Sequence, residues 1–479
     1  MATGVQYAGE YKLETCELIS SAGVVTDISG IIVEVNLFED MFKPTLTGSI
    51  LISDTNNLVD NMPIIGQEYI SLKIITPGLT ETEIDFTENI FCVYELGGRT
   101  KASNNSSEVV ELKLCSPELL RNYRTRVSQS FEQTIDKIIE SILQDAKYLD
   151  TRKDIYIEET SGIRKIVSPN YHPFDLITRL TRESMGLQGN NPHFLFFENL
   201  HGFHFRSLQS LYSEQVQGEY SYGDSGIDKH TNTTKGIDGR IPQAYRRILQ
   251  FQTPTKNNSL ADITGGMLGS TLIMHDVYNK KYHKTTFNYF QDHDTYSRLE
   301  TVDGNYAPRK YNPILIDDEN TVGDFTNAKI HLHPTSTTID GKDSQFITVP
   351  PTAEQGNKDY MSNRADIWLL QRKQRFHELN RGMTVNMSIH GNTAVATGQV
   401  IKVHVPVTGT DHENTGESKY ESGLYLISKL RHTFSQPTKT HLISLQATKD
   451  SYPYDFESVA SGKQPKPSDS SRIYQIQAS

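Results

Sequence analysis

Apolar and polar residues alternate through much of residues 1–115, as expected for strands that bury one face. Residues 70–74 and 110–114 give the clearest repeats, with isoleucine, leucine or valine at every second position. Turn-forming pairs such as Pro77-Gly78 and Asn104-Asn105 separate the alternating segments. The pattern predicts a small antiparallel barrel or sandwich in this part of the chain.

The apolar period lengthens to that of a helix after residue 130. Phe131, Ile135 and Ile139 recur at helical spacing, and Ser130 followed by Gln133 is typical of a capping box. We therefore expect a helix over residues 131–147. Three further elements are expected: a helix over residues 173–186, a hairpin over 194–205 and a helix between Asn363 and Gly382.

A second strand-rich block follows the last of these helices. Residues 383–389 alternate most regularly, and the turn pair Gly391-Asn392 follows them. Further strands are expected over residues 401–405, 424–430 and 442–447. Gly66-Gln67 and Gly398-Gln399 each precede an alternating strand, which is a weak sign of duplication. Residues 223–240 and 333–360 are polar and rich in turn-forming residues, so we expect two long loops there.

The composition is acidic. The 479 residues include 58 Asp and Glu against 47 Lys and Arg, a net charge of −11. This balance disfavours tight wrapping of nucleic acid, which needs clustered basic side chains. Cys16, Cys92 and Cys115 form no C-x-x-C element, which favours a reducing compartment over a disulfide framework. We expect no signal peptide and no transmembrane helix.

Signatures of catalysis or metal binding are incomplete in this sequence. His377-Glu378 begins like a zinc-protease helix, but Arg381 stands where the second histidine is required. A calcium loop starting at Asp54 fails at its turn and final ligand positions. The pairs His201/His204 and His331/His333 are interpreted as hydrogen-bonded or solvated histidines, although neighbouring histidines on a strand can share a metal. We therefore predict no catalytic residue, no metal ligand and no cofactor.

Several blocks resemble, in order, the baseplate central hub subunit of T-even-like contractile-tailed phages. Residues 36–54 are similar to its opening barrel, with an aromatic turn, Pro44 and Gly48 leading into the partner strand. Residues 172–177 resemble the start of its middle helix, and 194–208 the hairpin that follows. The C-terminal block over residues 385–427 resembles its second tube-like barrel, of a kind also found in late-control tail proteins and type VI secretion spikes.

The resemblance implies an α+β fold with two tube-like antiparallel β-barrel domains and an interleaved α/β region. The expected division has six parts: residues 1–115, first barrel; 116–210, α/β middle domain; 211–300, start of the second barrel; 301–375, insertion and loop region belonging with the middle domain; 376–450, rest of the second barrel; 451–479, flexible tail.

The same resemblance implies a structural, non-enzymatic role in the virion. Hub subunits form a homotrimeric ring whose six barrels adapt the hexameric tail tube to the trimeric central spike. Expected partners are therefore other copies of the chain, the tail tube protein, the spike protein and other baseplate proteins. DNA would pass through the ring without specific binding, and we hypothesise that acidic charge lines that bore. Assembly is expected in the host cytoplasm, without a membrane.

Exposed aromatic residues are candidates for the trimer or tube contacts. We name Phe38, Phe42, Phe205 and Tyr212, with the alternative that each belongs to a core. Two other functions stay open at this point: a tail-associated cell-wall hydrolase, which needs an acid/base pair in a cleft, and a glycan- or receptor-binding tail protein.

Overall fold

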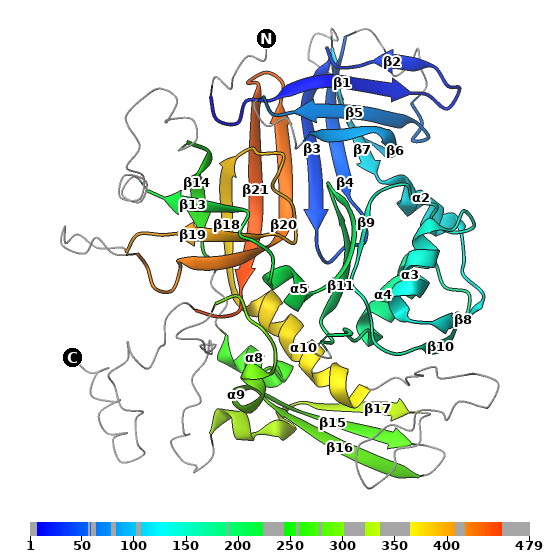
Figure 1. Ribbon diagram of the computed structural model, residues 1–479. Coiled ribbons are helices and arrows are strands. Elements are labelled where there is room, and N and C mark those ends of the chain that lie inside the picture. The colour runs from blue at the N-terminus through cyan, green and yellow to red at the C-terminus, as the bar shows by residue number, and fades with distance from the viewer. Residues whose placement is uncertain are drawn as a thin grey trace.

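The computed structural model has an α+β fold dominated by strands (Figure 1). The residues that it describes are 7–55, 58, 64–77, 83–101, 107–188, 191–223, 244–254, 258–276, 280–300, 321–335, 365–407 and 417–452. Two strand-rich units lie side by side, and an α/β unit lies beside the first of them. A small three-stranded sheet from residues 269–335 lies at the end of the molecule away from the first unit. The predicted fold class is confirmed.

The first β-unit contains seven strands of one continuous sheet, in the spatial order β3-β4-β7-β6-β5-β1-β2. Their bounds are β1 (Lys12–Ile19), β2 (Val25–Asp27), β3 (Ile32–Asp40), β4 (Thr47–Asp54), β5 (Tyr69–Ile75), β6 (Ile84–Lys101) and β7 (Glu108–Cys115). The sheet curls, so that Leu18 of β1 and Leu37 of β3 share one buried core. The alternation in residues 70–74 and 110–114 places their apolar side chains in this core, as predicted.

The second β-unit is a closed barrel of six strands. Their bounds are β13 (Gly218–Tyr222), β14 (Arg247–Gln252), β18 (Met383–His390), β19 (Val400–His404), β20 (Gly423–Ser435) and β21 (Thr440–Lys449). The sheet runs β13-β14-β18-β21-β20, and β19 pairs with both β20 and β13 to close it. The barrel is not wholly antiparallel as expected, because β13 pairs in parallel with both of its neighbours. Its core is separate from that of the first unit.

The two units share one topology. Numbered along the chain, β1, β3, β4, β5, β6 and β7 are strands 1 to 6 of the first unit, and the six barrel strands are 1 to 6 of the second. Both units have the spatial order 2-3-6-5-4-1. Strand 2 carries a bulge at the same place in each, between Ile32 and Glu34 and between Ile248 and Gln250. This correspondence supports the duplication that the two Gly-Gln pairs suggested.

The α/β unit connects the two β-units. It contains α2 (Pro117–Arg124), β8 (Ser130–Gln133), α3 (Ile135–Gln144), β9 (Ile155–Ile157), β10 (Arg164–Val167), α4 (Pro173–Glu183), β11 (Phe194–Asn199), β12 (Gly202–Ser207) and α5 (Leu208–Tyr212). The predicted hairpin and the helix from Pro173 are present. The helix predicted over residues 131–147 is wrong at its start. Phe131 is buried in β8, which pairs with β10, and the helix begins only after Thr134.

A long insertion separates strands 2 and 3 of the second unit. It holds α8 (Ser259–Gly265), β15 (Gly269–Asp276), β16 (Lys281–Asn288), α9 (Tyr289–Asp292), β17 (Ile330–Thr335) and α10 (Ala365–Arg381). The order β16-β15-β17 forms its own sheet, which packs on α10 (Figure 1). Residues 333–335 belong to β17 and not to a loop as expected, whereas 224–240 and 336–360 lie outside the described residues. The predicted domain boundaries stay a prediction.

Membrane insertion by a helix finds no support in the described part of the chain. No helix there is both long and apolar enough to cross a bilayer.

Candidate functional site: the junction between the units and the strand edges

The two β-units are joined edge to edge by β20 and β3. Residues 429–435 pair antiparallel with residues 34–40, so the sheet is continuous across the junction. The Arg431 guanidinium lies 5.6 Å from the centre of the Phe38 ring, and its Nε donates to Asn36 Oδ1 at 3.0 Å. The junction is therefore held by main-chain bonds and by side chains on its outer face.

A hollow of about 730 Å³ lies over this junction. Its lining comes from β3, the turn after it, the start of β4, and β14, β18, β20 and β21. It consists largely of amide, hydroxyl and apolar side chains. The charged lining residues are Glu39, Asp40, Lys43, Lys429 and Arg431, two acids and three bases. The acidic balance of the whole chain is therefore not concentrated on this face.

Two buried carboxylates connect the α/β unit to both β-units. Glu39 accepts hydrogen bonds from the amides of Thr397 (2.6 Å) and Leu200 (3.0 Å). Burial raises the pKa of Glu39 to about 7, against the lowering effect of those amide donors. Glu198 of β11 accepts from the Leu46 amide at 2.8 Å, next to the start of β4. A buried carboxylate needs such donors to be stable, so these contacts fix how the three units meet.

A buried ion triad reinforces the same place. Lys153 Nζ lies 2.9 Å from Glu118 and 2.6 Å from Glu198. Burial opposes the charge on Lys153, but the two carboxylates outweigh it and raise its pKa. Cys92 and Cys115 face each other across β6 and β7 beside the triad. Burial raises the pKa of the Cys92 thiol to about 11, so it is a poor nucleophile.

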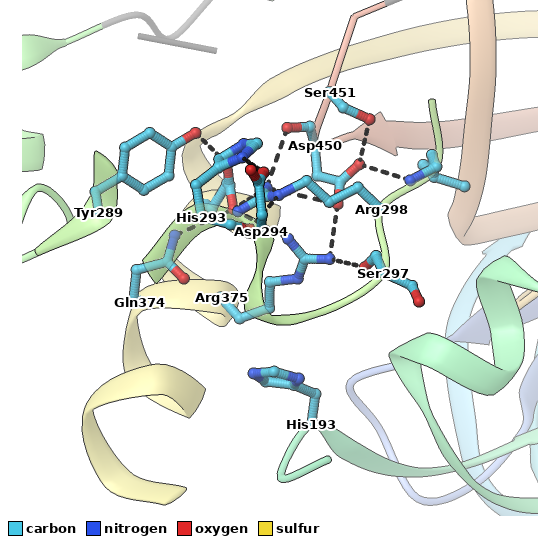
Figure 2. Close-up of polar contacts among 12 residues, drawn as sticks. His193, Tyr289, His293, Asp294, Ser297, Arg298, Gln374, Arg375, Asp450 and Ser451 are labelled. Atoms are coloured by element: carbon cyan, nitrogen blue, oxygen red, sulfur yellow. Dashed lines mark hydrogen bonds and ion pairs between the residues drawn. The ribbon is translucent and has the colours of Figure 1, made fainter. Parts of the chain in front are cut away.

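A second buried network ties the insertion to the barrel (Figure 2). Glu378 of α10 accepts from Arg298 Nη1 and from the Tyr289 hydroxyl, both at 3.0 Å. Asp450, just after β21, lies 2.9 Å from Arg375 Nη2, and its Oδ1 accepts from the Leu299 amide at 3.2 Å. Figure 2 shows the Arg375 guanidinium pointing toward Asp450, and Arg298 Nη1 lies 3.8 Å from Asp450 Oδ2. The network satisfies its charges internally and has the character of a structural clamp.

Two strand edges continue beyond their partners. β5 pairs with β6 as far as Cys92, whereas β6 continues to Lys101 with β7 alone among the described strands. Among the described residues, β13 pairs with the first two residues of β14, whereas β18 pairs with β14 as far as Gln252. These edges correspond to the two that meet at the junction: β6 is the counterpart of β20, and β14 is the counterpart of β3.

The predicted contact residues occupy different environments. Phe38 lies at the junction and Phe42 in the turn after β3, each 38% exposed. Phe205 is fully buried in the core of the α/β unit and therefore takes the alternative of a core residue. Tyr212 is half-buried, and the Arg375 guanidinium lies 5.5 Å from its ring centre.

The histidines singled out in the sequence are not gathered around a common centre. His204 Nε2 is 2.9 Å from Asn199 Oδ1, and its ring stacks on Tyr156. His331 Nδ1 is 3.1 Å from Lys373 Nζ. In the described part of the chain, no group of three His, Cys, Asp or Glu side chains could hold a metal ion.

Glu39 and Glu198 were not identified from the sequence as residues that organise the molecule. Each stands in an otherwise apolar or aromatic strand, with Glu39 in NLFED and Glu198 in FLFFEN. A charged residue on the inward side of a strand indicates a buried partner, and this pattern can be seen in the sequence.

Comparison with known proteins gives structural likeness alone. No family model and no curated protein matches the sequence. The 43 kDa tail protein of prophage MuSo2 from Shewanella oneidensis is 8% identical, over 91% of this chain and 98% of that chain, with a TM-score of 0.50. A tail protein from Neisseria meningitidis MC58 is 11% identical, over 92% and 97%, with a TM-score of 0.48. The likeness to the MuSo2 protein shows that this chain has the fold of a phage tail protein.

Proposed function

We propose that this chain is the structural hub subunit of a contractile-tail baseplate and that it forms a trimeric ring. The observation that carries the proposal is the repeated topology. Three chains with two equivalent β-units each present six similar units, which matches a hexameric tube on one side and a trimeric spike on the other. The fold shared with a phage tail protein supports this role.

The strand edges suggest how the ring closes. Within the chain, strand 5 of the second unit (β20) pairs with strand 2 of the first (β3). The same pairing between chains would join strand 5 of the first unit (β6) to strand 2 of the second unit (β14) of the next copy. Such a head-to-tail contact uses two different surfaces and produces a closed ring when the rotation fits.

The register of the contact follows from the correspondence between the units. The bulges of strand 2 align Glu34 with Gln250 and therefore Asn36 with Gln252. The bulge that β20 and β6 share, followed by a second bulge of β6 between Leu96 and Arg99, aligns Thr433 with Thr100. Thr433 is opposite Asn36 at the junction. Thr100 of one copy is therefore expected opposite Gln252 of the next, with both side chains exposed in the isolated chain.

The proposal also covers the proteins that the ring contacts and the channel at its centre. The ring would dock the tail tube and the central spike, together with other baseplate proteins, in the virion after assembly in the host cytoplasm. Phe42 and Phe38 are the candidate aromatic contacts with exposed surface. DNA would pass through the ring without specific binding. The passage of DNA does not require that acidic side chains line the channel.

The decisive experiment is a cysteine trap of the ring contact. The variant with Thr100→Cys and Gln252→Cys places one thiol on each proposed edge. Directly opposite residues of an antiparallel pair are close enough for a disulfide. Under mild oxidation we expect covalent trimers, three times 54.1 kDa, on non-reducing gels, and a ring-shaped particle of that mass by light scattering and negative-stain microscopy.

The control moves one thiol by two residues. Thr100→Cys with Gln250→Cys keeps both cysteines on the same edges but off the expected register, and should cross-link much less. The three native cysteines are buried and give a low background. Equal cross-linking of both variants would contradict the proposed register of the contact. A protein that stays monomeric at every concentration would count against the ring. Cell-wall hydrolysis or glycan binding by the purified monomer would favour the two alternative functions.

A further inference from the structure

The outer strand of the α/β unit has an edge that the rest of the fold leaves unused. β9 is the last strand of the sheet β11-β12-β9 and, in the described part of the chain, pairs only with β12. The Phe203 amide donates to the Asp154 carbonyl and the Glu158 amide to the Phe205 carbonyl, both at 2.9 Å. Because main-chain groups alternate in direction along a strand, the amides and carbonyls of residues 155 and 157 point away from β12.

The edge of β9 opens into a hollow of about 580 Å³ between β9 and α3. Its lining comes from one face of α3, from the segment that leads into β9 and from β9 itself. The lining residues are Asp136, Lys137, Glu140, Gln144, residues 151–155, Ile157 and Glu159. A groove between an edge strand and a helix is the geometry in which extended peptides bind by strand addition.

Most charged side chains of this groove are already engaged. Lys153 belongs to the buried ion triad, and Lys137 lies 2.9 Å from Glu140. Asp136 is buried and accepts from Thr160 Oγ1 at 2.6 Å. Their charges are therefore compensated within the fold.

Two carboxylates at the ends of β9 are different. Asp154 directly precedes the strand, Glu159 follows it by two residues, and both are exposed. No ion pair joins either of them to another described residue. Arg152 is the one exposed base in the lining apart from Lys137. The groove therefore offers hydrogen bonds along its length and an exposed carboxylate at each end. The Glu140 carboxylate, and to a lesser extent the charge of Glu159, raise the pKa of Lys137.

We propose that β9 accepts an extended segment of another protein as a fourth strand of this sheet, and that lysine or arginine side chains of the segment face Asp154 and Glu159. Main-chain bonds to residues 155 and 157 would supply the affinity, and the two carboxylates would select a basic segment. The surface is distinct from the ring contact, because it lies on the α/β unit and involves neither β6 nor β14.

The test removes a single hydrogen-bond donor from this edge. Ile157→Pro deletes an amide that points away from β12, and proline is tolerated at such a position of an edge strand. Ile157→Ala is the matched control, since it loses most of the same side chain but keeps the amide. A displayed library of random heptapeptides is panned on the full-length chain, with the Ile157→Pro protein as the counter-selection.

The expected result has two parts. Enriched peptides alternate apolar residues with lysine or arginine, bind the unmodified chain and Ile157→Ala alike, and bind Ile157→Pro at least tenfold more weakly. The double variant Asp154→Lys, Glu159→Lys binds the same peptides at least fivefold more weakly than the unmodified chain. This measurement tests the proposal even if the Ile157→Pro protein does not fold. A library with no peptide that distinguishes Ile157→Pro from Ile157→Ala, or one enriched in acidic peptides, would overturn the proposal.

Hydrogen exchange of the isolated chain separates the other possible occupants. An unoccupied edge predicts fast exchange of the residue 155 and 157 amides at every protein concentration. Protection that increases with concentration would assign the edge to a second copy of this chain, and protection at every concentration would assign it to a segment of the same chain. Either result would overturn the proposal of a foreign segment.

Discussion

The two β-units have the same strand order but differ in how they are completed. The second unit closes into a barrel, because β13 pairs with both β14 and β19. In the first unit, the corresponding strand β1 pairs with β2 and β5. Strand 2 of the first unit, which is β3, pairs instead with β20 of the second unit. The edge of strand 2 therefore closes the barrel in the second unit, whereas in the first unit the same edge joins the neighbouring unit.

The units also differ in what they carry between strands 2 and 3. In the first unit a short turn over residues 41–46 is sufficient. In the second, residues 253–382 intervene and contribute their own sheet and the helix α10. Insertions of this size are tolerated where strand ends stay anchored, and the anchor here is the buried network of Figure 2. The repeated strand order is therefore kept although the second unit carries a large insertion.

The largest effect is expected from breaking the anchor of the insertion. Glu378→Ala leaves Arg298 and Arg375 buried, with Asp450 as the one carboxylate among the described residues that still forms an ion pair with them. Removing one partner of a buried ion network costs about 3–5 kcal/mol, because the remaining charge is not solvated. We expect a loss of that size in chemical unfolding and faster hydrogen exchange in α10.

The control for this variant is an exposed ion pair at the junction of the units. Glu34 lies 3.4 Å from Arg431 at the surface, so Glu34→Ala should cost less than about 1 kcal/mol. If Glu378→Ala were as mild as Glu34→Ala, the network would not be what holds the insertion to the barrel.

The strand alternation could be predicted from the sequence, but the correspondence of the units could not. Inward positions of a barrel require apolar side chains, not particular ones, so duplicated units can diverge until little common sequence remains. The Gly-Gln pairs survive because Gly66 and Gly398 both adopt a φ of +86°, which favours glycine. The pairs were too short to establish the repeat without the strand order.

The error at residues 131–134 has a physical cause. Phe131 fits the helical period and Ser130 fits a cap, but the pairing of β8 with β10 buries Phe131 from a strand instead. Glu39 illustrates a second limit. Its donor Thr397 is 358 residues away, and only the assembled junction brings the two together. Local patterns report elements well, whereas such a contact depends on how the units dock.

An effect of intermediate size is expected from the pH dependence of the junction. The pKa of Glu39 is about 7 in the folded chain against 4.5 as its ordinary value, so the folded state binds the proton more tightly. The stability contributed by this group is therefore complete below pH 4.5 and is lost as the pH rises toward 7. The loss amounts to about 3 kcal/mol at most, because each tenfold difference in proton affinity between the folded and unfolded chain corresponds to about 1.4 kcal/mol.

Unfolding titrations at several pH values check this dependence. Glu39→Gln cannot titrate, so the decline between pH 4.5 and 7 should flatten in that variant relative to the unmodified chain. An unchanged slope in Glu39→Gln would mean that other groups cause the decline and that the buried carboxylate does not control the docking of the units.

The smallest effect tests the two equivalent glycines against each other. An alanine at either position must adopt a left-handed conformation, which costs about 1–2 kcal/mol. The added Cβ would lie 3.3 Å from the Tyr94 carbonyl at Gly66, but 2.8 Å from the Phe197 ring at Gly398. We therefore expect Gly398→Ala to lower the free energy of unfolding by about 1 kcal/mol more than Gly66→Ala. Gly30→Ala is the control, since nothing lies within 4 Å of its added Cβ. Equal losses for Gly66→Ala and Gly398→Ala would mean that the α/β unit does not press on the second barrel at Phe197, and that conformation alone explains why both glycines occur.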